Sequence, residues 1–385
     1  MLRPRVRVSL PGGLSEVVMV SSDGVMDEVV GDLSAYVISG AVSAVQGDVE
    51  YESDQRTPAQ GIQDAVEAEK LGFRAVFLSE RWDIKQADVI LSGAAALTSR
   101  VELGTAMVCP PTRQPWLMAA FAATMQACYG PRFTLGLGRG TDAIWNDMGL
   151  SMPGYPEMAD YVDILRRLWR GETVDYDGPV GRFPALAFSE IVPGPPPPVW
   201  FGTFARPKGA ALLASSFDGV LLPPVLTPEA TANAVARIRA ACDRIGRHSK
   251  EIRICQAVIT APGLDDTETR SLAHGRAVGY LQYPGYGETL IEENGWDIEV
   301  IHKLRAHRQL AANEKVADRL YHRHQLLEPA KLIPEEYMID SCAIGSVDEC
   351  VASLQRFRDA GADEIATYGS TPGQNAKLIE AWRNR

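Results

Sequence analysis

Apolar and polar positions along the chain follow two periodicities, one typical of buried strands and the other of amphipathic helices. Thr57 to Gly72 begins with an N-cap threonine, a proline at the first helical position and a capping-box glutamine, and it ends at a glycine. We expect a helix here, with Glu67, Glu69 and Lys70 facing solvent. Arg74 to Leu78 follows at once as a nearly continuous apolar run, which predicts a parallel strand buried on both faces.

The same unit repeats along the chain. Strands are expected at 33–43, 74–78, 101–108, 132–138, 199–202, 219–222, 252–259 and 363–368. The predicted helices between and after them cover 57–72, 83–99, 115–129, 158–170, 208–215, 228–245, 346–360 and 373–382. Such alternation requires right-handed crossovers and a parallel sheet. Eight strands predict a (β/α)8 TIM barrel, whose sites lie at the carboxyl ends of its strands. A doubly wound sheet is the alternative, although it rarely needs eight strands and two insertions.

Two segments interrupt the repeat, and a third precedes it. Residues 171–198, after the fourth strand, are expected to form a hairpin followed by a proline-rich connector. Residues 264–340, after the seventh strand, consist of helical pieces, and their length suggests a lid or an oligomer contact. Residues 1–31 are expected to form a peripheral arm or hairpin, with the barrel over 32–385.

Charge and apolar content exclude several classes of partner. The 385 residues are 46% hydrophobic, and 38 Lys and Arg against 49 Asp and Glu leave a net charge of -11. This excess of acid disfavours nucleic acid and anionic membranes as partners, and no apolar run is long enough to span a bilayer. We therefore expect a protein that acts on a small molecule.

The cysteines and the N-terminal residues indicate the compartment. The 6 cysteines form no C-x-x-C pair, so the sequence predicts neither a disulfide framework nor a zinc site. Arg3, Arg5 and Arg7 are basic, but Pro11 to Gly13 interrupt the apolar positions that a signal peptide would need. A cytoplasmic location is expected.

The histidines do not suggest a metal site. All 6 histidines fall in predicted helices or in the late insertion, away from the strand ends. His322 and His324 are two residues apart and cannot share a helix face, so we expect Tyr321 to His324 to be solvated surface. No metal is assigned.

The strand that ends at residue 138 is followed by a glycine-rich segment. In Arg132 to Gly140, glycines at alternate positions remove the side chains from one face, so a flat or phosphorylated ligand could approach the backbone N–H groups. Thr141 could then cap a helix. The spacing is G-x-G-x-G and it belongs to a fourth strand, which does not match a Rossmann fingerprint.

The residues that follow the other strands are mostly uncharged, apart from Glu80 and Arg81. A carboxylate and a guanidinium at a barrel mouth can hold hydroxyls and carbonyls, or they can form an ordinary salt bridge between strand and helix. A glycosidase needs two facing carboxylates, and only Glu80 is well placed. The remaining pattern is a weakly polar cup, suited to a flat cofactor that brings its own reactivity.

Several segments together resemble the bacterial luciferase-like superfamily. They are Leu103 to Met107, Phe121 to Met125, Leu135 to Gly140 and Leu165 to Glu172. The Gly138-Arg139-Gly140 form is similar to the coenzyme F420-dependent, actinobacterial branch, and Ser79 to Trp82 and Leu281 to Trp296 support that branch.

The resemblance implies a cofactor site at the strand ends. The deazaflavin ring would lie at the end of the third strand, where family members carry a non-prolyl cis peptide bond that corresponds to Ala106-Met107. The phosphate tail would meet N–H groups of Gly138 to Thr141 and Gly202 to Phe204. The expected cofactor-binding residues are Gly40, Ser79, Ala106, Met107, Gly138, Arg139, Gly140, Thr141, Gly202, Thr203 and Phe204.

The chain also departs from part of the family. In the sugar-phosphate dehydrogenases an acid-base histidine follows the second strand, where this chain has Arg81, and an acidic residue stands at the position of Thr141. These differences argue against that substrate and leave the acid-base residue unassigned. Glu80 and Arg81 are the candidate catalytic residues.

The sequence thus predicts an F420-dependent oxidoreductase that transfers a hydride to or from an organic substrate. An apolar substrate is expected because Trp82, Met107, Trp145 and Phe204 are predicted near the mouth. An FMN-dependent monooxygenase is the second interpretation, and a non-catalytic protein that binds a flavin or deazaflavin is the third. Family members are commonly dimers, so a homodimer or higher oligomer is expected.

Overall fold

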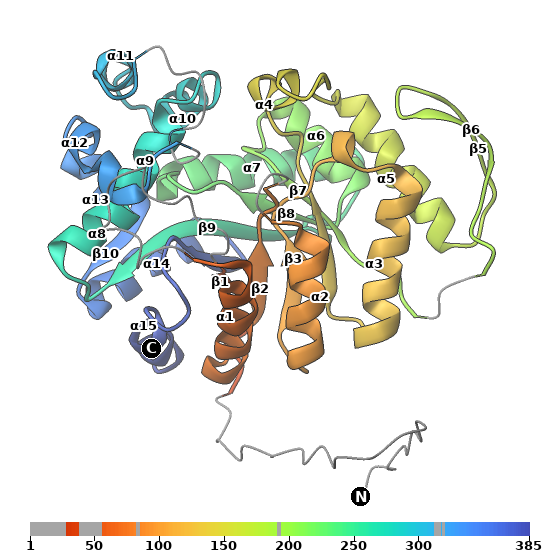
Figure 1. Cartoon of the computed structure of the whole chain (residues 1–385), viewed down its shortest axis with the longest axis horizontal. Helices are drawn as coiled ribbons and strands as arrows, with labels where there is room; N and C mark the ends of the chain where they lie inside the picture. The colour runs from red at the N-terminus through yellow and green to blue at the C-terminus, as the bar shows by residue number, and fades with distance from the viewer. Residues whose placement is uncertain (1–27, 38–55, 82–84, 191–193, 312–316, 318–319) are drawn as a thin grey trace, which may run out of the picture.

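The computed structural model describes residues 28–37, 56–81, 85–190, 194–311, 317 and 320–385, and it confirms the TIM barrel. Eight parallel strands form a closed ring, because β8 pairs with β9 as well as with β7 (Figure 1). The barrel strands are β1 (Leu33–Tyr36), β2 (Ala75–Leu78), β3 (Glu102–Thr105), β4 (Phe133–Leu137), β7 (Val199–Gly202), β8 (Gly219–Leu222), β9 (Arg253–Pro262) and β11 (Glu364–Tyr368). A doubly wound sheet is therefore excluded.

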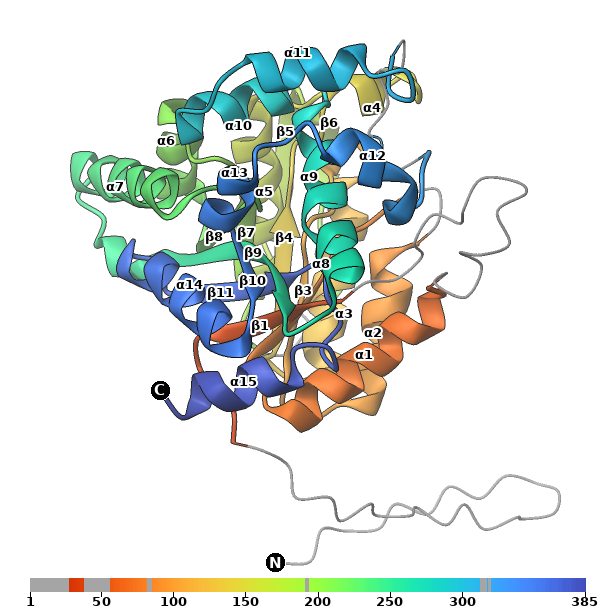
Figure 2. The same cartoon turned by 90° about the vertical axis from the view of Figure 1, so that its left-hand side faces the viewer.

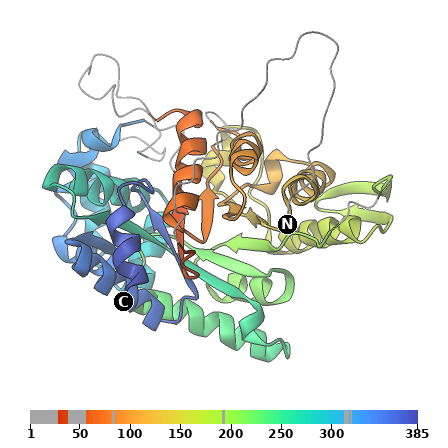
Figure 3. The same ribbon diagram turned by 90° about the horizontal axis from the view of Figure 1, so that it is seen from below.

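The predicted helices surround the barrel (Figure 3). They are α1 (Pro58–Leu71), α2 (Ala87–Leu97), α3 (Pro115–Tyr129), α5 (Tyr155–Trp169), α6 (Pro207–Ser216), α7 (Pro228–Arg244), α14 (Val347–Asp359) and α15 (Ala376–Arg383). In α1 the capping box is present: the Gln60 amide donates to the Thr57 hydroxyl, and the Gln60 side chain accepts from the Thr57 N–H. Gly72 ends the helix with a φ of 82°, a left-handed conformation that glycine adopts without strain.

Glu69 does not face solvent, and this part of the prediction is wrong. Its carboxylate accepts backbone N–H groups from Ser99 at 2.9 Å, Arg100 at 2.6 Å and Val101 at 2.8 Å. Burial raises the pKa of this carboxyl group, but the three backbone donors outweigh burial and lower the pKa. Glu69 therefore ties α1 to the connection between α2 and β3, a long-range contact that helical periodicity does not reveal.

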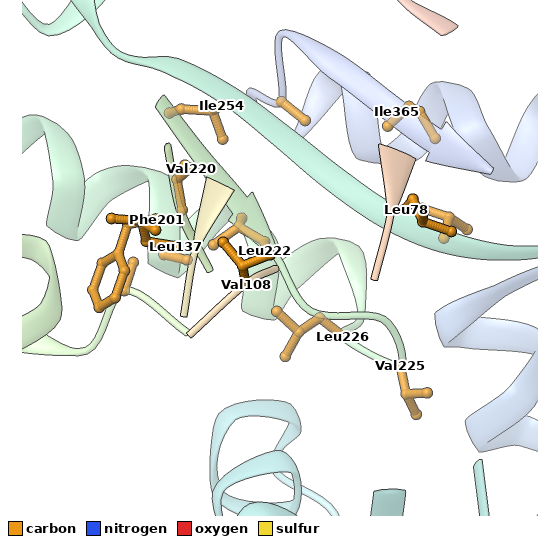
Figure 4. Close-up of a cluster of buried hydrophobic side chains, with 14 of the residues drawn as sticks. Leu78, Val108, Leu137, Phe201, Val220, Leu222, Val225, Leu226, Ile254 and Ile365 are labelled. Carbon is orange, nitrogen blue, oxygen red and sulfur yellow. The ribbon is translucent and has the colours of Figure 1, made fainter. Parts of the chain in front are cut away.

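The core has two layers. Side chains on the outer face of the barrel pack against the helices, and Figure 4 shows part of this layer, including Leu78, Leu137, Phe201 and Val220. A smaller cluster fills the inside of the barrel: Tyr36, Ala75, Phe77, Ala106, Trp200, Leu221, Cys255, Ala257 and Ala366. The strands are buried on both faces, which explains their continuous apolar runs.

A charged group closes the amino end of the barrel. The Glu364 side chain is only 1% exposed and accepts hydrogen bonds from the Ser34 hydroxyl and the Arg253 guanidinium. Arg74 Nε lies 3.6 Å from the same carboxylate. These contacts join β1, β9, β11 and the residue before β2 at the end of the barrel opposite to the expected site.

The two interruptions of the repeat take the predicted forms. A hairpin of β5 (Val174–Gly178) and β6 (Gly181–Leu186) precedes β7. After β9 come α8 (Asp266–Leu272), α9 (His274–Leu281), α10 (Tyr286–Asn294), α11 (Glu299–Ala306), η5 (Arg323–Leu326), α12 (Leu327–Ala330) and α13 (Glu335–Ser341). One strand was not predicted: β10 (Cys342–Gly345) pairs with the second half of β9, which extends to Pro262 rather than ending at Ile259.

The insertion helices lie over one end of the barrel. Helices α10 and α11 are at the same end as the short helix α4 (Asp142–Asn146), which follows β4 (Figures 1 and 2). This is the end at which the strands have their carboxyl termini. Among the described residues, no helix combines the length and apolarity needed to cross a membrane.

Glu69→Ala should lower the free energy of unfolding by about 2–3 kcal/mol, because it leaves three backbone N–H groups, including that of the buried Val101, without their acceptor. The pKa of Glu69 is lowered on folding, so its contribution exists at neutral pH and is lost as the pH falls below the unfolded value of about 4.3. Urea unfolding at pH 7 and pH 3 measures both effects. Glu67→Ala, at an exposed position of the same helix, is the control. Equal stability of the two variants at pH 7 would show that the hydrogen bonds of Glu69 to residues 99–101 do not stabilise the fold.

Candidate active site

The carboxyl end of β3 has an unusual backbone. The peptide bond between Ala106 and Met107 is cis, as the family resemblance implies. The Thr105 hydroxyl donates to the Gly136 carbonyl and accepts from the Gly136 N–H, both at 2.8 Å. The chain then rejoins β4 at Val108, whose N–H donates to Gly136 at 3.1 Å. The cis peptide bond thus lies between two points of attachment to β4.

The Met107 side chain occupies the space beside the glycines. A Cβ atom added at Gly202 would lie 2.7 Å from Met107 Cγ, and one at Gly138 would lie 3.1 Å from Met107 Cβ. At Gly136 it would lie 2.0 Å from the Thr105 carbonyl oxygen and 2.7 Å from Met107 Sδ. The expectation that the alternate glycines leave one face open to a ligand is therefore wrong where Met107 covers them.

Some of the N–H groups expected to meet phosphate are used within the barrel. The Gly138 N–H donates to Val108 at 2.9 Å, and the Thr203 N–H donates to Leu221 at 3.3 Å. Thr141 precedes α4 but its side chain does not cap that helix, and its hydroxyl contacts the hydroxyl of Tyr283 in the insertion. Gly138 and Thr203 can therefore offer a cofactor only surface contact, not their amide hydrogens.

Arg139 and Gly140 shape the segment between β4 and α4. The Arg139 guanidinium donates to the Pro153 carbonyl at 2.7 Å and lies 4.3 Å from the centre of the Tyr155 ring. Gly140 has a φ of 67°, and an added Cβ would meet the Trp145 indole at 2.3 Å. Trp145 is buried under this segment and donates to the Arg139 carbonyl at 2.7 Å, so it supports the mouth rather than lining it.

Glu80 forms the ordinary salt bridge that was one of its two interpretations. Its carboxylate pairs with Arg113 and accepts the N–H of Ala87, the first residue of α2, at 3.2 Å. The side chain is only 6% exposed. The backbone of Arg81 pairs with that of Lys85 in an antiparallel bridge. Glu80 therefore holds the end of β2 to the start of α2.

The loop after β7 is held by a neighbouring helix. Arg237 of α7 donates to the Ala205 carbonyl at 2.9 Å and to the Phe204 carbonyl at 3.3 Å. Its guanidinium also pairs with Glu293 of α10 at 2.5 Å. Ala205 adopts a φ of 50°, which is uncommon for a residue with a side chain. The insertion and the barrel thus share the support of this loop.

Four tyrosines form a layer across the mouth. The Tyr36 hydroxyl donates to the Ala106 carbonyl, and the Tyr36 and Tyr368 ring centres are 4.8 Å apart. The Tyr280 and Tyr368 hydroxyl oxygens are 2.7 Å apart, and Tyr280 stacks on Tyr286 with ring centres 5.4 Å apart. Burial raises the pKa of Tyr36, Tyr280 and Tyr286 above its ordinary value, so these phenols are neutral.

The sequence identified this layer only in part. Tyr368 is the last residue of a predicted strand, and Tyr280 and Tyr286 lie in the aromatic segment of the insertion, but none was assigned a role. Of the expected cofactor residues, Ser79 is half-buried and hydrogen-bonds Tyr36, whereas Gly40 lies outside the described residues, as does Trp82. The contact between β11 and the insertion could not be read from the local pattern.

The expectation that Tyr321 to His324 are solvated surface is wrong for the histidines. His322 is 3% exposed, and its ring centre lies 4.9 Å from that of His324. His324 Nε2 lies 3.6 Å from the Glu268 carboxylate. The cause is the packing of η5 against α8 and α9. No group of three potential metal ligands occurs in the described part of the chain.

Comparison with known proteins shows the family to which this chain is similar. Residues 39–364 match the family profile of luciferase-like monooxygenases. The 5,10-methylenetetrahydromethanopterin reductase of Methanopyrus kandleri is 26% identical over 333 residues, which are 81% of this chain and 89% of the relative. An F420-dependent glucose-6-phosphate dehydrogenase of Nakamurella multipartita is 28% identical over 214 residues, which are 52% of this chain and 62% of that relative.

A solved structure shows the same fold. The coenzyme F420-dependent tetrahydromethanopterin reductase from Methanopyrus kandleri superimposes with a TM-score of 0.72 and 18% identity. The match covers 92% of this chain and 97% of the reductase chain. At this identity the likeness extends to the fold of the barrel and its insertions.

Gly136→Ala should be far more destabilising than Gly138→Ala. The first places a Cβ 2.0 Å from a backbone oxygen, and we expect a loss of about 3 kcal/mol or more. The second meets side-chain atoms alone, Met107 Cβ at 3.1 Å, Met107 Cγ at 3.4 Å and Cys109 Sγ at 3.8 Å, so a loss within about 1 kcal/mol is expected. Urea unfolding followed by circular dichroism measures both. Similar losses of stability for the two variants would show that the close approach of the Thr105 carbonyl oxygen is not the reason why residue 136 is glycine.

Proposed function

The chain belongs to the luciferase-like monooxygenase family, and on that premise we propose that it is an F420-dependent oxidoreductase. The observation that carries the proposal is the mouth itself, where Ala106 and Met107 at the end of β3 form one apolar cluster with Tyr36 and Tyr368. Two relatives are named as F420-dependent, which supports F420 as the cofactor: the glucose-6-phosphate dehydrogenase of Nakamurella multipartita and an oxidoreductase of Mycobacterium tuberculosis that matches 79% of this chain. Bound F420 would supply hydride transfer, and the protein would supply orientation and exclusion of water.

The residues at the mouth fit a flat cofactor with a charged tail. Ala106 and Met107 form an apolar surface for a ring, next to the half-buried Ser79. Arg139 to Thr141, with Gly202 and Phe204, would lie along the tail, where the Arg139 guanidinium adds a positive charge. Gly138 and Thr203 would contribute contact without donating their N–H groups.

The substrate proposed is an organic compound with an apolar body. Met107, Phe204, Tyr280 and Tyr286 present apolar surface at this end of the barrel, and each is partly exposed. Trp145 no longer supports this argument, because it is buried beneath Gly140. The insertion would act as a lid. A cytoplasmic homodimer is proposed from the family resemblance alone.

Titration of the purified protein with F420 and with FMN tests the cofactor. We expect F420 to saturate its binding site at micromolar concentration, as measured by quenching of the F420 fluorescence. FMN should bind at least about tenfold more weakly. Preferential binding of FMN would replace the proposal with an FMN-dependent monooxygenase. Saturable F420 binding without turnover on a broad panel of carbonyls and alcohols would favour a non-catalytic binding protein.

Variants of Glu80 and Arg81 test the two candidate catalytic residues. Glu80→Gln should lower the free energy of unfolding by about 3 kcal/mol, because it leaves the Arg113 charge without its closest partner. Arg81→Ala should weaken F420 binding by about tenfold, a loss of about 1.4 kcal/mol, if its charge lies near the cofactor. Arg182→Ala, on the exposed hairpin, is the control. Unchanged F420 affinity and turnover in both variants would remove these residues from the site.

A further inference from the structure

The hydroxyl groups of Tyr280 and Tyr368 form an isolated polar pair at the mouth. Their oxygens are 2.7 Å apart, and either atom can be the donor. In the described part of the chain, neither hydroxyl has another hydrogen-bond partner. A phenol has one donor hydrogen and two acceptor positions, so one hydrogen of the pair is used between the two oxygens and the other is available. This pair can therefore donate one hydrogen bond to a third oxygen.

The position of the pair relates it to the cis peptide bond. Tyr368 is the last residue of β11, and its ring packs edge-on against Tyr36, whose hydroxyl holds the Ala106 carbonyl. Tyr36, Ala106, Met107 and Tyr368 belong to one apolar cluster inside the barrel. Only the Tyr36 ring thus links Tyr368, which can carry the available hydrogen, to Ala106, where the cofactor ring is proposed to bind.

The surroundings make the pair the best-placed polar group for chemistry. Glu80 is engaged by Arg113 and by the start of α2, and the Tyr36 hydroxyl is engaged by Ala106. Tyr286 stacks on Tyr280, and Tyr36 packs edge-on against Tyr368. The Arg276 guanidinium lies 5.2 Å from the centre of the Tyr368 ring, within the range of a cation–π contact.

Resting on the proposed function, we propose that Tyr368, paired with Tyr280, binds the oxygen of a carbonyl substrate and supplies its proton during reduction. Bound reduced F420 would supply the hydride that forms a C–H bond at the carbonyl carbon, and the C=O π bond would break. The electron pair of that bond moves to the oxygen, which takes the proton of Tyr368. The Tyr368 phenolate then regains a proton from water, while Tyr280 stays neutral and keeps its hydrogen bond to Tyr368.

Burial keeps Tyr280 neutral. It raises the pKa of Tyr280 well above its ordinary value, and the neighbouring Tyr368 and Tyr286 raise it further. A neutral Tyr280 can donate its hydrogen to the Tyr368 oxygen, which leaves the Tyr368 hydrogen for the substrate oxygen. The class of substrate that follows is an aldehyde or ketone with an apolar body.

The first test measures binding by the full-length protein, free and saturated with oxidised F420, with cyclohexanone as the probe. Protein labelled with carbon-13 at the tyrosine Cζ reports hydrogen bonding at each phenol, and the 12 tyrosine signals are assigned with Phe variants. We expect cyclohexanone to shift the signals of Tyr368 and Tyr280, and Tyr368→Phe to weaken cyclohexanone binding by about tenfold. Tyr280→Phe should weaken it less, because Tyr368 keeps its hydroxyl.

Tyr176→Phe is the matched control. It removes a phenol that donates to Asp160 at 2.8 Å in the distant hairpin, so it should change neither the probe affinity nor the turnover. Tyr368→Phe should keep F420 affinity within about twofold, which separates loss of the oxygen contact from loss of the cofactor site. With reduced F420, it should slow reduction of any carbonyl that the wild type accepts by about 100-fold.

The outcomes are distinguishable. Unchanged signals for Tyr280 and Tyr368 up to the solubility limit of cyclohexanone, in both forms of the protein, would overturn the proposal. Turnover by Tyr368→Phe at the wild-type rate would also overturn it. Failure of the wild type to bind F420 would instead overturn the proposed function, and the shift measured on the free protein would still decide whether the tyrosine pair binds a carbonyl.

Discussion

The position of the Met107 side chain is the constraint on which the mouth of the barrel depends. It lies across the ends of β4 and β7 and occupies the space that Gly136, Gly138 and Gly202 leave free. A side chain at position 202 would meet Met107, and a side chain at position 136 would meet both Met107 and the Thr105 carbonyl oxygen. Three strands can therefore approach here only because glycines stand opposite one methionine.

This packing couples the backbone of β3 to the tyrosine layer. The carbonyl of Ala106, at the cis peptide bond, is the acceptor of Tyr36 from β1, and Tyr36 in turn packs against Tyr368 of β11. The insertion continues the layer through Tyr280 and reaches the loop after β7 through Phe204, whose ring centre lies 4.9 Å from that of Tyr286. The insertion is thus part of the mouth rather than an addition to the outside of the barrel.

The sequence predicted the barrel because the signals for it are local. Apolar runs, the Thr57 capping box and the glycine at residue 72 each determine a short segment, and eight repeats of that unit leave few topologies. The errors concern contacts between distant segments. Glu69 is buried because it accepts N–H groups from residues 99–101, His322 is buried because η5 packs on other helices, and β10 exists only because β9 is long enough to pair with it.

The same distinction explains why the site was predicted less completely than the fold. The resemblance predicted Ala106 and Met107 at the end of the third strand, and periodicity predicted a strand that ends at Tyr368, but the partner of each side chain was not visible. Glu80 shows the consequence: a carboxylate at a strand end suits chemistry by position, and its bond to Arg113 commits it to structure. Tyr368 is the opposite case, because its hydroxyl becomes chemically significant only when Tyr280, 88 positions away in the chain, lies beside it. Chemistry in this barrel therefore depends on what the insertion brings to each strand end.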